Sequence, residues 1–538
     1  MATQYAHPQV VEAPYDGPEH SDGSDNEAEM QLPYAAVPEP APDAMYAGPP
    51  GIPAPVPVAM RNLSVYVAGA NSNGQLGMYR TSRRNKSDVH APGTIPGSVF
   101  LAVACGDSCS AGISVTGELY TWGQGGQFQL GHGSRYDHYY PRRVDELAGV
   151  RLRLIAAGKR HMVAVSEANE VFTWGDGTGG ILGHRRKVSD YLAWYRKRPS
   201  RLATLPHDIG HIVQVVCGQN HTMLLTADGV VYVWGRGQFH VLGTGLTKCE
   251  EIPRRLLGVG RVVHMAAGRH HSICVDDGGN VFTWGSNKYG QLGHPPTVLM
   301  ASVPMAVEGL LGKRIVQVSA GDDFTLALAD DGRIYSFGRN SDGRLGNVDK
   351  KLFRSRKTYV PTALEGFGPG ETEHRAVKIG CGRGFGAVLT ATNDMFAFGR
   401  NARGQLGMPE RKGKAAWEPS WLRLLHGVCL DFSAGGEHLA VICDMSLRVS
   451  STAASQLGTD PAAPLDDNPQ MQLQARPDPP AAAAAPSIVG APEDFVAGAP
   501  VHQGDAGIYA GPSYAEYKAD DDDEPLKKGD GVPTKTVD

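Results

Sequence analysis

Residues 280–294 read NVFTWGSNKYGQLGH: an apolar run ends in Trp284-Gly285, a polar patch follows, and Leu292-Gly293 stands near the end. Closely related phrases occur at residues 119–132 (LYTWGQGGQFQLGH) and 230–244 (VVYVWGRGQFHVLGT). The β-branched and aromatic residues of the run predict a strand, and the glycines predict tight turns. Because the phrase recurs, we expect one structural unit to be repeated along the chain.

Three glycine positions keep a fixed spacing in the repeats. The glycine that ends the strand precedes the Leu-Gly glycine by 8 residues in every copy, at Gly69/Gly77, Gly123/Gly131, Gly175/Gly183, Gly235/Gly243, Gly285/Gly293, Gly338/Gly346 and Gly399/Gly407. A third glycine opens a G-x-x-H-like phrase at Gly106, Gly158, Gly218, Gly268, Gly321, Gly382 and Gly435, and the first six precede the next strand-ending glycine by 17 residues. An insertion in a hairpin would move every later side chain to the other face, so this constant interval predicts a β-hairpin.

The turn of this hairpin is also visible in the sequence. Asp228-Gly229 stands between two apolar runs, as do Asp277-Gly278, Asp331-Gly332 and Thr116-Gly117, and such pairs predict a two-residue turn. By contrast, the interval from each Leu-Gly glycine to the next G-x-x-H-like glycine varies between 25 and 36 residues. We expect these segments to contain the loops in which the repeats differ.

The two ends of the array complement each other. The first strand, within VYVAGANSNGQLG at residues 65–77, has no hairpin partner before it, and the last G-x-x-H phrase, SAGGEHLAVIC at residues 433–443, has no Trp-Gly strand after it. Pairing these two segments would close a ring of seven units and remove its open edges. The sequence therefore predicts an all-β, seven-bladed propeller over residues 61–445.

The segments outside the repeats, residues 1–60 and 446–538, are rich in Pro, Ala and acidic residues, which predicts disordered tails. Residues 1–58 hold nine acidic and no basic residues, and residues 451–538 hold fifteen acidic and five basic residues. Residues 59–450 hold 46 basic and 32 acidic residues, a net charge of +14. We expect such a body to attract anionic partners, which include the chain's own acidic tails.

The compartment is predicted from what the sequence lacks. It has no N-terminal basic region followed by an apolar stretch, and no run of 18 apolar residues. Its eight cysteines are scattered and form no C-x-x-C pair, which favours free thiols in a reducing environment. We therefore expect an intracellular protein, cytoplasmic or nuclear, that is neither secreted nor inserted in a membrane.

The repeat phrases resemble those of the regulator of chromosome condensation family. AAGRHHSICV at residues 266–275 and SNKYGQLG at residues 286–293 match the family's phrases closely, and the likeness extends over residues 61–445. The resemblance implies a seven-bladed β-propeller. It leaves the function open, because the family includes nucleotide exchange factors, ubiquitin-ligase modules, receptors and scaffolds.

Most of the repeated polar and aromatic residues are expected to be structural. Histidines that occur once per repeat around a ring cannot converge on a metal or a substrate, and we expect them to bond backbone groups between blades. The tryptophans that end the strands should pack between blades. The residues predicted to be structural are His161, His221, His271, His438, Trp122, Trp174, Trp234 and Trp284.

No enzyme active site, metal site or cofactor site is predicted. The one G-x-G-x-x-G phrase, at Gly175, Gly177 and Gly180, lies in a repeat turn with no helix predicted after it, so it is not expected to bind a dinucleotide. Walker A, H-E-x-x-H and nucleophile-elbow patterns are absent from the sequence.

Basic residues cluster directly after Leu-Gly in four repeats, and equivalent positions should share one face of the ring. Two of the clusters also carry tryptophans, and Trp and Arg on loops are common anchors of protein interfaces. The candidate partner-binding residues are Arg185, Arg186, Lys187, Trp194, Arg196, Lys197, Arg198, Lys350, Lys351, Arg354, Arg356, Lys357, Trp417 and Trp421; further clusters include Arg83 and Lys412. A plainer alternative is that Trp194 and Trp417 pack on the side of the propeller and the charges are only solvated.

These observations favour a non-catalytic scaffold that binds a protein or another anionic partner with one basic face. The resemblance offers two alternatives, a guanine-nucleotide exchange factor for a Ran-type small GTPase and a chromatin-associated binder. Exchange members of the family carry an enlarged turn after one Trp-Gly strand, whereas every such interval in this chain is 8 residues. Chromatin-binding members tend to have a basic N-terminal tail, whereas this one is acidic.

Overall fold

The computed structural model describes residues 62–78, 88–95, 97, 99–185, 194–347, 356–370, 374–409, 414–422 and 427–446. The ladder of strands begins at Leu63 and ends at Asp444. Apart from Ser446, the two predicted acidic tails lie outside the described residues. No helix in these ranges is long and apolar enough to cross a membrane.

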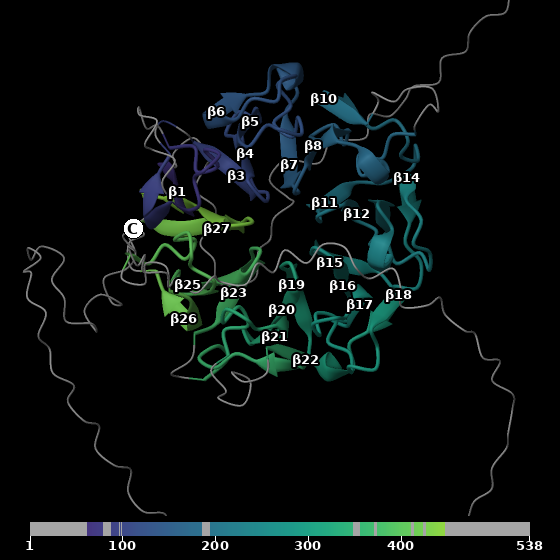
Figure 1. Ribbon diagram of the computed structural model, residues 1–538, viewed down its shortest axis with the longest axis vertical. Helices are drawn as coiled ribbons and strands as arrows, with labels where there is room; N and C mark the ends of the chain where they lie inside the picture. The colour runs from purple at the N-terminus through teal and green to yellow at the C-terminus, as the bar shows by residue number, and fades with distance from the viewer. Residues whose placement is uncertain are drawn as a thin grey trace, which may run out of the picture. The chain divides into compact units, whose positions relative to one another are not determined.

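The described strands form seven four-stranded antiparallel sheets arranged as the blades of a ring (Figure 1). The innermost strands are β3 (Phe100–Cys105), β7 (Leu152–Ala157), β11 (Ile212–Cys217), β15 (Val262–Ala267), β19 (Ile315–Ala320), β23 (Ala376–Cys381) and β27 (Val428–Ala434). The second strands are β4 (Cys109–Ser114), β8 (His161–Ser166), β12 (His221–Thr226), β16 (His271–Asp276), β20 (Phe324–Ala329), β24 (Phe385–Thr390) and β28 (His438–Asp444). The predicted all-β, seven-bladed propeller is confirmed.

The third strand of each blade is the one that ends in Trp-Gly or its equivalent. These strands are β5 (Leu119–Gly123), β9 (Val171–Asp176), β13 (Val231–Gly235), β17 (Val281–Ser286), β21 (Ile334–Arg339), β25 (Met395–Gly399) and β1 (Leu63–Gly69). The outer strands are β6 (His138–Arg143), β10 (Tyr195–Arg201), β14 (Glu250–Arg255), β18 (Met300–Ala306), β22 (Lys357–Ala363), β26 (Ala416–Trp421) and β2 (Val89–Thr94). Short 3-10 helices are η2 (Asp145–Leu147), η3 (Thr178–Gly180), η4 (Gln238–His240) and η5 (Glu308–Leu310). The blades are numbered from the first, β3–β6, to the sixth, β23–β26.

The ring closes as the two incomplete repeats predict. The seventh blade, here called the closing blade, has the strand order β2-β1-β28-β27, so it joins the two ends of the propeller sequence. β1 pairs with β28 in a continuous register from Leu63 opposite Asp444 to Gly69 opposite His438. This pairing leaves neither strand with an open inner edge.

The hairpin turn differs in detail from the prediction. Thr226 donates its backbone N–H to Val230 and its carbonyl accepts from Gly229, at 3.0 and 2.9 Å, so the loop contains three residues rather than two. Gly229 has a φ of +81°, the left-handed conformation that closes a three-residue hairpin loop. The predicted two-residue turn is therefore wrong in length, although the glycine is where the turn requires it.

The segments of variable length are more than loops. Each contains the outer strand of one blade and leads to the innermost strand of the next, as β18 and β19 show between Gly293 and Gly321. All seven outer strands contain one proline, at Pro92, Pro141, Pro199, Pro253, Pro304, Pro361 and Pro419. Each of these strands departs from regular register against its neighbour. Proline and a bulge both prevent further strand pairing, so they protect the exposed edge of each blade.

The core lies between the blades. One cluster, for example, joins Ile113 and Leu119 of the first blade to Met162 and Trp174 of the second. The turn before each Leu-Gly also packs on the next blade, and this contact can be tested at Gly290, which has a φ of +86°. A Cβ atom added there would lie 2.4 Å from the carbonyl oxygen of Thr358.

We expect Gly290→Ala to destabilise the propeller by roughly 2–4 kcal/mol, because the variant combines backbone strain with a backbone clash. Gly312→Ala is the matched control, since Gly312 has a φ of +75° but no atom within 4 Å of the added Cβ. The control should lose only the strain component, about 1 kcal/mol. Urea unfolding followed by circular dichroism compares the two, and equal losses would show that the interblade contact contributes nothing.

Candidate interaction face

One end of the ring carries both the Trp-Gly strand ends and the G-x-x-H turns. In each blade the residue after the strand-ending glycine donates its backbone N–H to the G-x-x-H turn, as Arg236 does to Asn220 at 2.9 Å. The equivalent bonds are Ala70 to Glu437, Gln124 to Ser108, Asp176 to Arg160, Ser286 to His270, Arg339 to Asp323 and Arg400 to Gly384. The outer strands begin at the same end. We call this end the insert face, and the opposite end, with the hairpin turns, the hairpin face.

The described residues that border the basic segments lie at the insert face. Arg185 is exposed just after the Leu-Gly turn of the second blade, and Tyr195, next to Trp194, pairs with Asp176 at the start of β10. Arg356 and Lys357 are exposed where β22 begins, and Lys357 pairs with Arg339. The candidates Arg186, Lys187, Lys350, Lys351 and Arg354 lie outside the described residues.

An aromatic and basic cluster that the sequence reasoning missed joins the first and second blades on this face. The rings of Phe128 and Tyr195 lie 5.6 Å apart. The Arg135 guanidinium lies 4.9 Å from the centre of the Phe128 ring and 5.3 Å from that of Tyr195, and the Lys197 ammonium lies 5.7 Å from Phe128. Phe128 has a φ of +61°, and five other blades have glycine at the equivalent position of the turn. The replacement of this glycine by phenylalanine is the feature of the sequence from which the cluster could have been predicted. Such clusters hold cations at defined positions on a surface.

The other candidates on β10 differ in their contacts. Arg196 is half-buried, whereas Lys197 and Arg198 are exposed. Arg198 forms an ion pair of 3.1 Å with Glu146 of the first blade. Exposed ion pairs contribute little to stability, so Arg198 remains able to exchange Glu146 for another carboxylate.

The structure does not bring all of the candidate tryptophans together. Trp194 and Trp417 are half-buried near the insert face, and an added Cβ on Gly343 would meet Trp417, which therefore packs on the turn of the neighbouring fifth blade. Trp421 stands five residues after Ala416 on β26, opposite Phe396. The register shift in β26 means that Ala416 and Trp421 stand opposite Gly399 and Phe396, which are only three residues apart on β25. At a rise of about 3.3 Å per residue, Trp421 lies about 10 Å from the start of the strand, toward the hairpin face.

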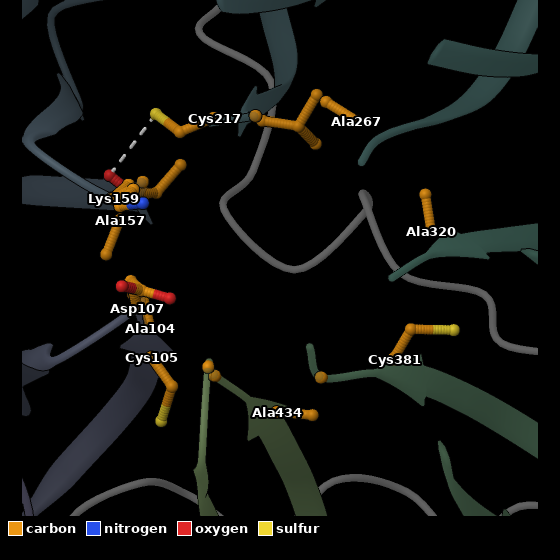
Figure 2. Close-up of a pocket in the computed structure, with 18 of the residues that line it drawn as sticks. Ala104, Cys105, Asp107, Ala157, Lys159, Cys217, Ala267, Ala320, Cys381 and Ala434 are labelled. Atoms are coloured by element: carbon orange, nitrogen blue, oxygen red, sulfur yellow. Dashed lines mark hydrogen bonds between the residues drawn. The ribbon is translucent and has the colours of Figure 1, made fainter. Parts of the chain in front are cut away.

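A cavity of about 330 Å³ opens on the ring axis at the ends of the innermost strands. The first two residues of each G-x-x-H-like turn border it, and the second of these is Asp107, Lys159, Gln219, Arg269, Asp322, Arg383 or Gly436. Figure 2 shows Asp107 and Lys159 on neighbouring blades at this mouth, with Cys105, Cys217 and Cys381 along the wall. Burial raises the pKa of Cys105 and of Cys381 to about 12, so these thiols stay protonated at neutral pH.

Most of the charged side chains at the mouth lie close together, around Asp322. Asp322 accepts a bond of 3.0 Å from Arg383 and lies 4.0 Å from Arg269, which in turn bonds Gln219 at 3.0 Å. Burial raises the pKa of Asp322 to about 6, although both arginines oppose that shift. Lys159 lies on another blade of the same mouth. The mouth combines a paired arc of charges with Lys159 and Asp107, which lie on neighbouring blades.

The repeated histidines join neighbouring blades through a hydroxyl group. His221 Nε2 lies 2.9 Å from the hydroxyl of Ser272 in the next blade, and that hydroxyl donates to the Val241 carbonyl at 2.8 Å. The same arrangement links His161 to Thr222, His271 to Thr325 and His438 to Ser110, at 2.8–3.0 Å. The partner is therefore a side-chain hydroxyl, and not backbone directly as the sequence suggested. Where the histidine is replaced by Cys109, Phe324 or Phe385, the position that would supply the hydroxyl is Met162, Gly386 or Leu439.

These contacts determine the state of each histidine. The serine or threonine donates its only hydroxyl hydrogen to a carbonyl, so it must accept the hydrogen of Nε2. Nδ1 then carries no hydrogen, and no described residue offers it a hydrogen-bond partner. Burial lowers the pKa of His161 and His438 to about 4 and that of His221 and His271 to about 3, so all four rings are neutral.

The tryptophans reinforce the same contacts. Trp122, Trp174, Trp234 and Trp284 are fully buried. Each indole nitrogen donates to a backbone carbonyl in the turn of the preceding blade, at 2.8–3.0 Å. Trp284 and Ser272 share the Val241 carbonyl, so one turn is held by two side chains.

A family model described as the RCC1-like domain matches residues 58–388, and the regulator of chromosome condensation (RCC1) repeat matches residues 376–405. The chain belongs to the RCC1-like domain family. The predicted resemblance is thereby confirmed.

Among curated relatives, the RCC1-like chain is 30% identical to the Ultraviolet-B receptor UVR8 of Arabidopsis thaliana over 374 residues, which cover 69% of this chain and 79% of the receptor. It is 33% identical over 339 residues to the E3 ubiquitin-protein ligase HERC2 of Homo sapiens, covering 61% of this chain but only 6% of the ligase.

The fold of this RCC1-like chain is also found in solved structures. Prp20p from Saccharomyces cerevisiae, whose structure is described together with its binding to Gsp1p and histones, superposes with a TM-score of 0.63 at 21% identity, over 74% of this chain and 94% of that one. Human WBSCR16 superposes with a TM-score of 0.63 at 24% identity, over 71% of this chain and 99% of that one. Within the described residues of this chain, no group of three or more His, Cys, Asp or Glu side chains could hold a metal ion.

Proposed function

We propose that this RCC1-like chain is a non-catalytic scaffold that binds a partner protein of net negative charge with its insert face. The observation that carries the proposal is the convergence of features on that face: the borders of the basic segments, the Phe128–Tyr195 cluster and the cavity mouth with Lys159. A net charge of +14 over residues 59–450 adds long-range attraction for such a partner. The acidic tails supply a competing anion within the same chain. All eight cysteines are free, which supports an intracellular site of action, cytoplasmic or nuclear.

A charge-neutralised insert face tests this function. We expect Arg196→Ser/Lys197→Ser/Arg198→Ser to reduce capture of partner proteins from a cell extract at least tenfold, because cations at a shared face are lost together. The matched control is Lys313→Ser/Arg314→Ser/Arg333→Ser, which removes three charges near the hairpin face and, like the first variant, breaks one exposed ion pair. Quantitative mass spectrometry of the captured proteins gives the comparison. Equal losses in both variants, or in neither, would rule out the insert face as the binding surface.

Nucleotide exchange on a Ran-type GTPase is the second candidate. It is favoured by the likeness to Prp20p, whose structure is described with its binding to Gsp1p. The 8-residue turns after the Trp-Gly strands argue against it, since none of the seven is enlarged. Release of a fluorescent GDP from a Ran-type GTPase distinguishes the two functions: acceleration by the full chain would establish exchange, and a rate equal to the uncatalysed one would exclude it.

A chromatin-associated role is the remaining alternative. Prp20p is described with its binding to histones, but histones are basic and this propeller body carries a net positive charge. A binding curve with purified nucleosomes at two salt concentrations would test this role. Binding that weakens steeply with salt would indicate contact with DNA phosphates rather than with histones.

A further inference from the structure

Two thiols face each other inside the closing blade. Cys429 of β27 and Cys443 of β28 are directly opposite in the ladder, and their Sγ atoms lie 3.5 Å apart. Both side chains are buried, with exposed fractions of 6% and 0%. The two cysteines are therefore neighbours in space within one blade.

Cys429 and Cys443 form a non-hydrogen-bonded pair of the antiparallel ladder, the kind of pair in which the two Cα atoms are closer. Met445, two residues after Cys443, donates its backbone N–H to Asn62, just before β1, at 2.7 Å. In an antiparallel ladder, every second residue of a strand points its backbone N–H and C=O to the same neighbouring strand. Cys443 therefore bonds toward β1, and it stands opposite Cys429 in a non-hydrogen-bonded pair. The Cα atoms of such pairs lie about 4.5 Å apart, within the range of about 4.4–6.8 Å that disulfides span.

The other six blades show that the dithiol is not a requirement of the fold. The equivalent pairs are Phe100/Ser114, Leu152/Ser166, Ile212/Thr226, Val262/Asp276, Ile315/Ala329 and Ala376/Thr390. In five of them an oxygen of the second residue accepts a backbone N–H from the hairpin turn, as Thr226 does from Val230 at 3.2 Å. β28 has no such turn, because its neighbour β1 comes from the other end of the propeller. In the closing blade the residue at this position, Cys443, therefore has no hairpin turn to which it could hydrogen-bond.

We propose that Cys429 and Cys443 are a site of oxidative modification, at which a hydroperoxide converts the two thiols into a disulfide between β27 and β28 of the closing blade. With hydrogen peroxide, the Cys429 thiol loses its proton and the thiolate attacks one oxygen. The O–O bond breaks, the sulfur becomes a sulfenic acid, and the departing hydroxide takes up the proton lost by the thiol to form one water. The Cys443 sulfur then attacks the Cys429 sulfur, which forms the S–S bond and releases a second water. Both thiols are oxidised and the peroxide is reduced to two water molecules.

The environment favours Cys429 as the first thiol to react. Cys429 retains an exposed fraction of 6%, whereas Cys443 is fully buried. The contact between the two thiols lowers the pKa of Cys429, and the same contact and burial raise the pKa of Cys443. Only the pair Val428 and Asp444 separates the dithiol from the end of the β27–β28 ladder. Ladder ends open at low free energy, which gives a small oxidant its access.

Peptide mapping of the full chain tests the proposal. The protein is treated with increasing hydrogen peroxide, alkylated with N-ethylmaleimide, denatured and digested for mass spectrometry. We expect the Cys429–Cys443 cross-linked peptide to appear at lower peroxide than any product of the fully buried Cys274, and to disappear after a thiol reductant. Two free thiols at these positions when the exposed Cys249 is already fully oxidised would overturn the proposal, as would a disulfide with any other cysteine.

A variant with the residues of the third blade provides the matched control. Cys429→Ile/Cys443→Thr introduces the Ile212/Thr226 pair of that blade at the same ladder position. Oxidation should raise the urea midpoint of the wild-type protein, because the disulfide restricts the unfolded chain, and should leave the midpoint of the variant unchanged. An equal shift of the urea midpoint in both proteins would show that the stabilisation does not come from Cys429 and Cys443. Cys443→Ser tests the order of the steps, since Cys429 should then stop at the sulfenic acid and react with dimedone.

Discussion

Lowering the pH from 7 to 5 is expected to destabilise the propeller by on the order of 8 kcal/mol through four buried histidines alone. His161, His221, His271 and His438 have pKa values of about 3 to 4 in the folded protein. Their unfolded values are about 6.5, so below that pH the unfolded chain binds protons that the folded chain does not. Stability is therefore present above pH 6.5 and is lost progressively toward pH 4, at about 2 kcal/mol per histidine at pH 5.

Other groups change the size of this effect but not its direction. His132 and His184 also have pKa values of about 4, and they add to the loss. Asp322 acts in the opposite sense, because its folded pKa of about 6 lies above the unfolded value and favours folding as the pH falls. Urea unfolding at several pH values measures the sum.

A double variant isolates one histidine. His221→Phe/Ser272→Gly reproduces the Phe324 and Gly386 combination that stands at the equivalent positions farther around the ring. The difference in stability between pH 7 and pH 5 should be smaller in this variant by about 2 kcal/mol, whatever its absolute stability. A pH dependence identical to that of the wild type would show that His221 is not neutral and buried in solution.

Trp234→Ala is expected to lower the free energy of unfolding by about 3–5 kcal/mol, because it leaves a large cavity between the second and third blades. Trp234 is fully buried, and its indole donates to the Ile181 carbonyl at 3.0 Å. The alanine variant leaves that carbonyl with Thr222 alone. Urea unfolding followed by far-ultraviolet circular dichroism gives the midpoint.

Trp234→Phe is the control that separates shape from the hydrogen bond. Phe337 and Phe398 fill the equivalent positions in the fifth and sixth blades, so the site accepts phenylalanine in this fold. The variant should lose about 1–2 kcal/mol, mainly for one interblade hydrogen bond and a smaller ring. If the alanine and phenylalanine variants unfold at the same urea concentration, the packing of the indole does not stabilise the contact between blades.

Much of the propeller follows from spacing alone. The constant 17-residue and 8-residue intervals define the hairpin and its closing turn, because neither a paired strand nor a tight turn tolerates an insertion. The missing partners at the two ends predict the pairing of β1 with β28, and the structure confirms it. Residues such as Trp234 and His221 are recognisable as structural because the same residue type recurs at the equivalent position in four of the seven repeats.

The site is less predictable, because it depends on distances between blades. Sequence order does not show that the Ser272 hydroxyl meets His221, 51 residues away, although the matching loss of both groups in other blades was a readable signal. The Phe128–Tyr195 cluster joins residues of neighbouring blades, and the cavity mouth is bordered by residues from all seven turns.

Local sequence determined the strands, the turns, the number of blades and the closure of the ring, since these depend on side-chain periodicity and on fixed loop lengths. Only the tertiary structure decided which charges share a face, that Trp421 lies at the end of β26 nearer the hairpin face, and that Cys429 meets Cys443. The physical reason is the same in each case. Closing the ring brings equivalent positions of separate repeats to one end, and the distances between them are set by the packing of blade on blade.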